Sequence, residues 1–162
     1  MSLLLSAFFL VISNRYQDCR AGENAQEMVE KLQREIEAMG DNCVQGTMLS
    51  GYLGWEMPQK ELDGKQYVGI LQIPILELTL PVLAECNARN LDVAPCLYAG
   101  ALSEKNMVIA GHNYRTHFGN LKYLSEGMEV CFLDVEGKMY FYNVKEVEVL
   151  EKGEAKEMCD GG

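Results

Sequence analysis

With 162 residues, the chain is long enough for one domain with a substantial core and too short for two. Hydrophobic residues make up 48% of the chain and charged residues 23%, a globular composition that argues against intrinsic disorder. The formal net charge of −10 argues against nucleic acid as a partner, because binding phosphates requires a basic face.

Residues 1–12 are nearly all apolar, and no basic residue precedes Arg15. A helix over them would span only about 18 Å, against roughly 30 Å of membrane hydrocarbon. A signal peptide would also need a positively charged start. Two interpretations remain: the end of a signal anchor, or a short hydrophobic helix lying on a surface. We expect the first, a partial membrane anchor over residues 1–14.

A helical stalk and linker are expected over residues 15–64. A helix is predicted over residues 20–39, because apolar residues recur at spacings of three and four, and Gly40 is a natural stop. The narrow apolar stripe predicts light packing on the following domain and is too short for a coiled coil. Residues 40–64 are rich in glycine, and Trp55 and Met57 either dock on the domain or belong to a mobile surface segment.

The rest of the chain alternates short apolar runs with turns. A first strand from Tyr67 ends before Pro74, since proline cannot donate to a sheet ladder. Further strands are predicted over residues 76–83, 107–110, 128–134 and 138–150, with one helical turn near Asn90. Many short strands without a βαβ rhythm predict an all-β barrel or sandwich.

Six cysteines are scattered singly, with no C-x-x-C and no zinc-finger spacing. Single cysteines in an apolar chain mostly act as small core residues, although Cys86 and Cys96 could form a bridge across their loop. We expect no cofactor and no metal site. No carboxylate cluster requires calcium.

A histidine stands where one predicted strand gives way to a loop. The apolar run from Met107 to Ala110 is followed by Gly111, His112 and Asn113. A histidine held by a strand end and facing a cleft suits a general acid or base, because the side chain titrates near neutral pH. A structural role for His112 is the alternative.

Four segments in this order resemble the sortase family, the extracytoplasmic cysteine transpeptidases of Gram-positive bacteria. They are YVGILQIPILELTLPV at 67–82, YAGA at 98–101, NMVIAGHNY at 106–114 and FGNLKYLSEGMEV at 118–130. The resemblance covers roughly residues 65–150. It implies an all-β, sortase-like β-barrel over residues 65–162, preceded by an N-terminal helix and incomplete at its C-terminus.

The resemblance also implies a location and partners. Sortases are commonly held by an N-terminal anchor, so we expect a protein on the extracytoplasmic face of the cell membrane. The expected partners are the C-terminal sorting-signal peptide of a surface protein and an amine from a peptidoglycan precursor or a pilin. The expected function joins the two, linking surface proteins to the cell wall or to pilins.

His112 matches the histidine of the family and is the expected catalytic residue. Sortases carry the nucleophile in a Thr-Leu-x-Thr-Cys strand followed by an arginine, and neither motif occurs here. Arg115 stands too early in the chain, and His117 is interpreted as a loop residue. We therefore expect a chain that stops before the nucleophile, folds poorly and has no transpeptidase activity.

Two other functions remain open at this stage. One is a non-catalytic β-barrel module that binds sorting-signal peptides without turnover. The other is an unrelated hydrolase using Cys159. Glu157 and Asp160 flank this cysteine, and neighbouring carboxylates disfavour a thiolate.

Overall fold

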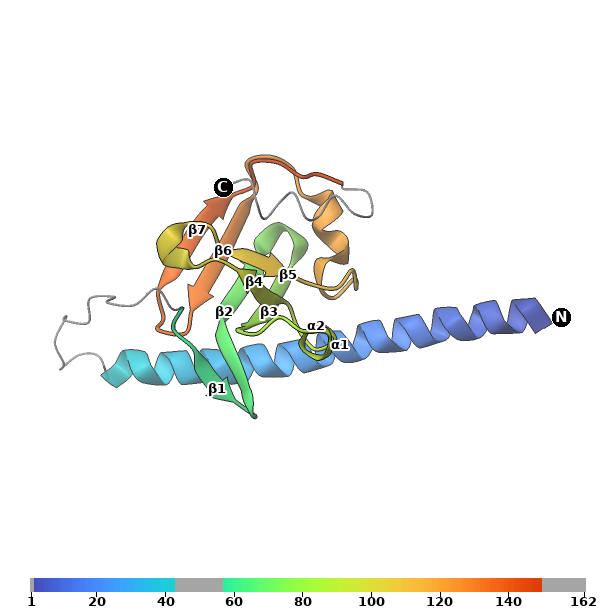
Figure 1. Cartoon of the computed structure of the whole chain (residues 1–162), viewed down its shortest axis with the longest axis horizontal. Coiled ribbons are helices and arrows are strands. Elements are labelled where there is room, and N and C mark those ends of the chain that lie inside the picture. Colours follow the sequence, from blue (N-terminus) through green and yellow to red (C-terminus); the bar gives the residue numbers. More distant parts are fainter. Residues whose placement is uncertain (1, 43–56, 150–162) are drawn as a thin grey trace.

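The computed structural model describes residues 2–42 and 57–149 of the chain. One long helix, α1 (Ser2–Asn42), runs along one side of a curled sheet, and its N-terminal part extends past the sheet (Figure 1). The expectation of a sheet-dominated, barrel-like fold preceded by an N-terminal helix is therefore confirmed.

Within the described residues, seven strands form a single mixed sheet. They are β1 (Lys60–Leu62), β2 (Lys65–Ile73), β3 (Leu78–Leu83), β4 (Cys96–Ala99), β5 (Val108–Ala110), β6 (Glu129–Asp134) and β7 (Met139–Asn143). The order is β5-β4-β3-β2-β6-β7, with β1 also paired to β2. Only β3 and β4 run parallel; the other pairs are antiparallel. The short helices are η2 (Pro74–Leu76), α2 (Ala88–Leu91), η3 (Leu102–Glu104) and η4 (Phe118–Tyr123).

The central strand β2 supplies the core on both faces of the sheet. Tyr67 and Ile70 belong to a cluster on the α1 side, whereas Val68 and Leu71 belong to a cluster on the other side. Residues 67 and 70 share a face because the pairing with β3 shifts register between Tyr67 and Gly69. Gly69 is required there, since a Cβ would lie 2.3 Å from the Leu133 carbonyl oxygen.

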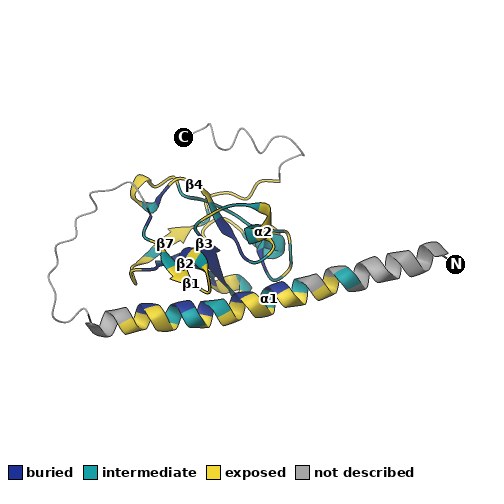
Figure 2. Cartoon of the chain, turned by 60° about the horizontal axis from the view of Figure 1, so that its bottom comes forward, coloured by how far each residue is buried: buried dark blue, intermediate teal, exposed yellow. Residues whose placement is uncertain are grey.

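The helix α1 is part of the core, so the prediction of light packing is wrong. One face of it is buried against the sheet (Figure 2). The buried residues are Ala21, Ala25, Val29, Leu32 and Ile36. A narrow apolar stripe is enough for this packing. The alanines at its start let the helix approach the sheet closely, and the larger residues further along fill the cluster beneath β2 and β3.

The boundaries of two elements differ from the prediction. The helix begins at Ser2 instead of residue 20, since no glycine or proline interrupts residues 2–19. It therefore runs across the boundary expected between residues 14 and 15. Strand β7 ends at Asn143 rather than near 150, because its partner β6 begins at Glu129, opposite Asn143, and a turn precedes it.

The predicted N-terminal anchor is also wrong. Among the helices that the structure describes, none is both long enough and apolar enough to cross a membrane. The apolar run at the start of α1 is short because charged residues begin at Arg15 and recur along the helix. The predicted location at the cell membrane depended on that anchor and is wrong for the same reason.

The expected linker contains ordered structure at its end. Met57 is buried in the cluster on the far side of the sheet, which favours the docking interpretation for this residue. Strand β1 follows within the same segment. Trp55, Cys43 and Cys159 lie outside the described residues.

Candidate active site

His112 lies just beyond the end of β5, which is the outermost strand on one side of the sheet. Gly111 precedes it without a side chain because the Phe118 ring fills the space; a Cβ there would lie 2.7 Å from Phe118 Cδ2. The Phe118 backbone N–H donates to the His112 carbonyl at 3.1 Å. The backbone of His112 is thus fixed, while its side chain remains 41% exposed.

Two side chains orient the imidazole of His112. Its Nε2 lies 3.1 Å from Oδ1 of Asp92, the residue that follows α2. The Tyr114 ring packs against it, with centroids 4.9 Å apart. A carboxylate that accepts from Nε2–H leaves Nδ1 as the nitrogen that exchanges protons.

The sequence predicted His112 as a site residue but gave no indication of its two neighbours, Asp92 and Tyr114. Asp92 is 20 residues away in the sequence, within a loop whose course no local pattern predicts. Tyr114 lies two residues beyond His112, and aromatic residues are too common beside turns to indicate a site. The prediction of a helical turn at α2 was the nearest available signal.

The described cysteines include two with the environment of core residues. Cys96 on β4 is fully buried and its Sγ donates to the Ala94 carbonyl at 3.4 Å. Burial, and then the neighbouring Cys86, raises the pKa of the Cys96 thiol to about 12. Burial and Glu129 raise the pKa of Cys131 as well. A nucleophilic cysteine requires the opposite shift, because the thiolate is the reactive form.

Among the cysteines that the structure describes, none forms a disulfide. Cys86 and Cys96 are free thiols, so the option of a disulfide across their loop is not realised. Cys19 is exposed on α1. Within residues 2–42 and 57–149, no three His, Cys, Asp or Glu side chains are arranged to hold a metal ion.

His117 is a fully buried residue of the same loop. Neither of its ring nitrogens has a hydrogen-bond partner. Burial, and to a lesser extent His112, lowers the pKa of His117 below 6.5. The Ala21 backbone and Asp18 oppose this shift, although neither forms a hydrogen bond with the ring nitrogens. The Tyr114 ring lies between the two histidines, 5.4 Å from the His117 ring. His117 is therefore a loop residue, as predicted, and it packs under α1.

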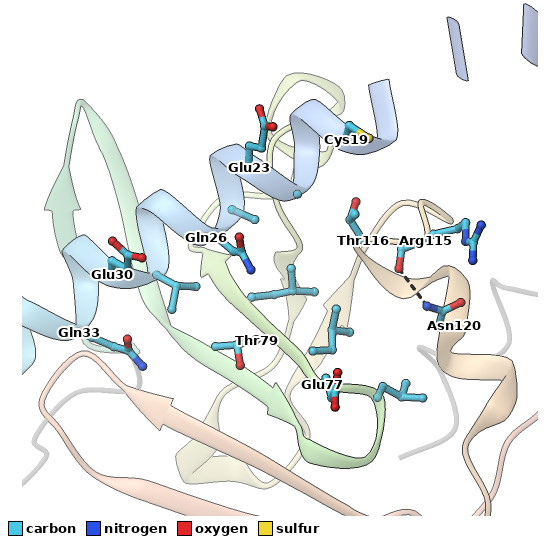
Figure 3. A pocket seen from close by; sticks show the side chains of 16 residues that line it. Cys19, Glu23, Gln26, Glu30, Gln33, Glu77, Thr79, Arg115, Thr116 and Asn120 are labelled. Carbon is cyan, nitrogen blue, oxygen red and sulfur yellow. Dashed lines mark hydrogen bonds between the residues drawn. The ribbon is translucent and has the colours of Figure 1, made fainter. Parts of the chain in front are cut away.

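Three cavities surround this region. The largest, about 700 Å³, lies between α1 and the β3 hairpin; Arg115 and Thr116 line one end (Figure 3). A second, about 410 Å³, reaches from Tyr16 and Arg20 of α1 to Asp92 and thus adjoins His112. The third, about 340 Å³, is mainly apolar and lies between β5, η4 and the far face of the sheet. Its lining includes Leu102, Met107, Ile109, Phe118, Leu121 and Phe132.

The chain is similar to known proteins in sequence family and in fold. A family model described as the sortase domain matches residues 71–160. Among solved structures, sortase C of Clostridium perfringens with the C-terminal cell wall sorting motif has a TM-score of 0.50 and 19% identity, covering 82% of this chain and 73% of that one. Sortase C-1 of Actinomyces oris has a TM-score of 0.48 and 19% identity, covering 80% and 81%.

Sortase C-3 of Streptococcus pneumoniae has a TM-score of 0.47 and 18% identity, covering 90% of this chain and 76% of that one. No curated protein matches the chain. Likeness at such low identity concerns the fold alone. The sortase model, however, covers more than half of the 162 residues, and the chain therefore belongs to the sortase family.

Proposed function

We propose that this chain carries the general acid, His112, of a sortase-type cysteine transpeptidation, whose nucleophile motif does not occur in the sequence. That the chain has no transpeptidase activity stays a prediction, which a cleavage assay tests. The substrates are the C-terminal sorting signal of a surface protein and an amine of a peptidoglycan precursor or a pilin. The observation that carries the proposal is the pair of His112 and Asp92, 3.1 Å apart at the end of the edge strand β5.

The pair suits acyl transfer from a peptide. A thiolate attacks a backbone carbonyl, and the nitrogen of the cleaved peptide bond leaves as an amine once it is protonated. With Nε2–H directed to Asp92, a protonated His112 offers its Nδ1 proton to that nitrogen and later accepts a proton from the incoming amine. The role of Asp92 is to hold the ring in this orientation.

The apolar cavity supports recognition of the peptide. It is bordered by Ile109, just before the site, and by Phe118, just after it. Apolar cavities with a few polar groups at their rim are the usual sites for peptides and small molecules. Sortase C of Clostridium perfringens, which shares the fold, has been crystallised with a C-terminal sorting motif. A sorting-signal peptide lying over β5 and η4 would pass beside His112.

A second function, binding of the sorting signal without turnover, is favoured by the cysteines. Cys96 and Cys131 are buried and burial raises the pKa of both thiols, which suits core packing. We propose that neither is the nucleophile. If no other thiol of the chain serves, the protein would hold the peptide and leave it intact.

One experiment separates the two functions. The 162-residue chain is mixed with a fluorescent peptide carrying a C-terminal sorting motif, and both cleavage and fluorescence anisotropy are followed. Cleavage that His112→Ala abolishes and Cys96→Ala leaves intact supports transpeptidation. Saturable binding without cleavage supports the binding module. Absence of both would refute the proposal, provided that circular dichroism shows a folded chain.

A further inference from the structure

The helix α1 is hydrogen-bonded to the loop that carries His112. The carboxylate Oδ1 of Asp18 accepts from the Thr116 backbone N–H at 3.3 Å. The Thr116 hydroxyl lies 2.9 Å from the Asp18 carbonyl oxygen and 3.2 Å from Oδ1. The two residues are 98 positions apart in the sequence, so these bonds fasten the helix to a distant loop.

The surfaces around this contact fit closely. Gly22 faces Thr116, and a Cβ at Gly22 would lie 2.8 Å from Thr116 Cγ2. Ala21 on the helix is 4% exposed, and His117 on the loop is fully buried. Figure 3 shows Thr116 on the loop beside α1, at the end of the largest cavity. The small residues of the helix and the buried His117 ring thus fix the position of the loop against α1.

Backbone hydrogen bonds within the loop couple the position of Thr116 to that of His112. The N–H groups of His117 and Gly119 both donate to the Tyr114 carbonyl, at 3.0 and 2.8 Å, and Phe118 N–H donates to the His112 carbonyl. The Tyr114 ring lies between those of His112 and His117. A displacement of Thr116 would therefore move the ring against which His112 packs.

We propose that Asp18 is a positioning residue for His112, which makes α1 a component of the site. The proposal rests on the proposed function, since the role of His112 gives its position a consequence. Asp18 does not touch the imidazole; it acts through Thr116 and Tyr114. Tyr16 and Arg20 of α1 also line the cavity that Asp92 and Tyr114 border, so a shift of α1 would change the surroundings of both residues that contact the imidazole.

The test uses the ring signals of His112 in nuclear magnetic resonance spectra. The chain has only two histidines, so labelling with ¹⁵N-histidine gives few signals, and His112→Gln assigns them. Asp18→Ala should displace the His112 ring signals, because the acceptor for the Thr116 backbone N–H is lost. Asp18→Asn should restore them, because its side-chain oxygen still accepts. Glu23→Ala removes a charge from the same helix and should leave the signals in place.

A variant on the loop tests the contact from the other side. Thr116→Val removes the hydroxyl and should displace the His112 signals in the same direction as Asp18→Ala. Unmoved His112 signals in either folded variant would overturn the proposal, and so would a displacement equally large in Glu23→Ala. If Asp18→Ala does not fold, the His112 ring signals of Thr116→Val test the proposal by themselves. The ring signals do not depend on turnover, so failure of the peptide assay alone would refute the proposed function and leave this inference standing.

Discussion

At the residue scale, the pair of Asp92 and His112 is expected to matter for orientation and little for stability. The side chains of His112 and Asp92 are 41% and 68% exposed, and exposed ion pairs contribute at most about 1 kcal/mol. Asp92→Ala should therefore change the tautomer balance of the His112 ring, measured by ¹⁵N shifts, with a small change in the urea midpoint. Asp92→Asn should retain much of the preference for Nε2–H through its amide oxygen. A loss of stability above about 2 kcal/mol would contradict the assigned role, since exposed pairs do not contribute that much.

Two tyrosines of the sheet should respond in opposite directions to loss of the hydroxyl group. Tyr67 is fully buried and its hydroxyl has no hydrogen-bond partner, whereas the Tyr140 hydroxyl donates to Asp134 at 3.2 Å. An unpaired buried polar group costs about 1–3 kcal/mol, so Tyr67→Phe should raise the free energy of unfolding. Tyr140→Phe should lower it by about 1.5–3 kcal/mol, because a hydrogen bond to a carboxylate is lost. Urea denaturation of both variants measures this, and equal destabilisation would contradict it.

The sequence predicted individual residues where the evidence was local. His112 follows an apolar run and Gly111, so its place at the end of a strand could be predicted from neighbouring residues. The contacts of His112 with Asp92 and of Asp18 with Thr116 could not, because they join distant segments through the tertiary fold. For the same reason, the burial of His117 depends on α1, which the local sequence of its loop does not contain.

At the element scale, α1 should behave as a core helix. Leu32 is fully buried between α1 and the sheet, within the cluster that contains Tyr67 and Ile70. Leu32→Ala should cost about 2–5 kcal/mol, because it leaves a cavity under β2. Glu37→Ala, on an exposed part of the same helix, should change stability by less than about 0.5 kcal/mol. Equal, small effects in chemical denaturation would show that α1 is a loosely attached stalk, as its narrow apolar stripe suggested.

The elements themselves were predicted best where turn-forming residues limit them. Pro74 ends β2 as expected, and a helical turn occurs near Asn90. The pattern failed where length depends on a partner: β7 is short because β6 supplies no further residues to pair with. The sequence pattern also failed to predict how α1 packs. Its periodicity indicated the buried face of the helix but not how closely the alanines bring the helix to the sheet.

At the scale of the whole molecule, composition argued against nucleic acid as a partner and predicted one domain, yet it could not predict where α1 packs. The apolar residues at the start of the chain suggested an anchor, but the helix they begin is too short in its apolar part to cross a membrane. The same helix instead covers the loop of the candidate site and closes the core on one face of the sheet. Whether a helix is buried by a membrane or by its own domain depends on tertiary packing, which composition does not contain.

The stability of the whole fold should therefore depend on pH through His117, which α1 keeps from solvent. Burial and the nearby His112 lower its pKa in the folded chain, with Asp18 and the Ala21 backbone opposing, whereas an unfolded chain restores a pKa near 6.5. As the pH falls below about 6.5, the unfolded chain takes up this proton first. The stability contributed by the neutral ring is complete above that pH and is lost as the pH falls toward the lowered folded-state pKa. Urea midpoints measured from pH 7.5 to 5 should fall for the wild type and for His112→Gln, and fall less for His117→Gln. Parallel curves for the wild type and His117→Gln would mean that the ring is hydrated and that α1 does not seal the loop.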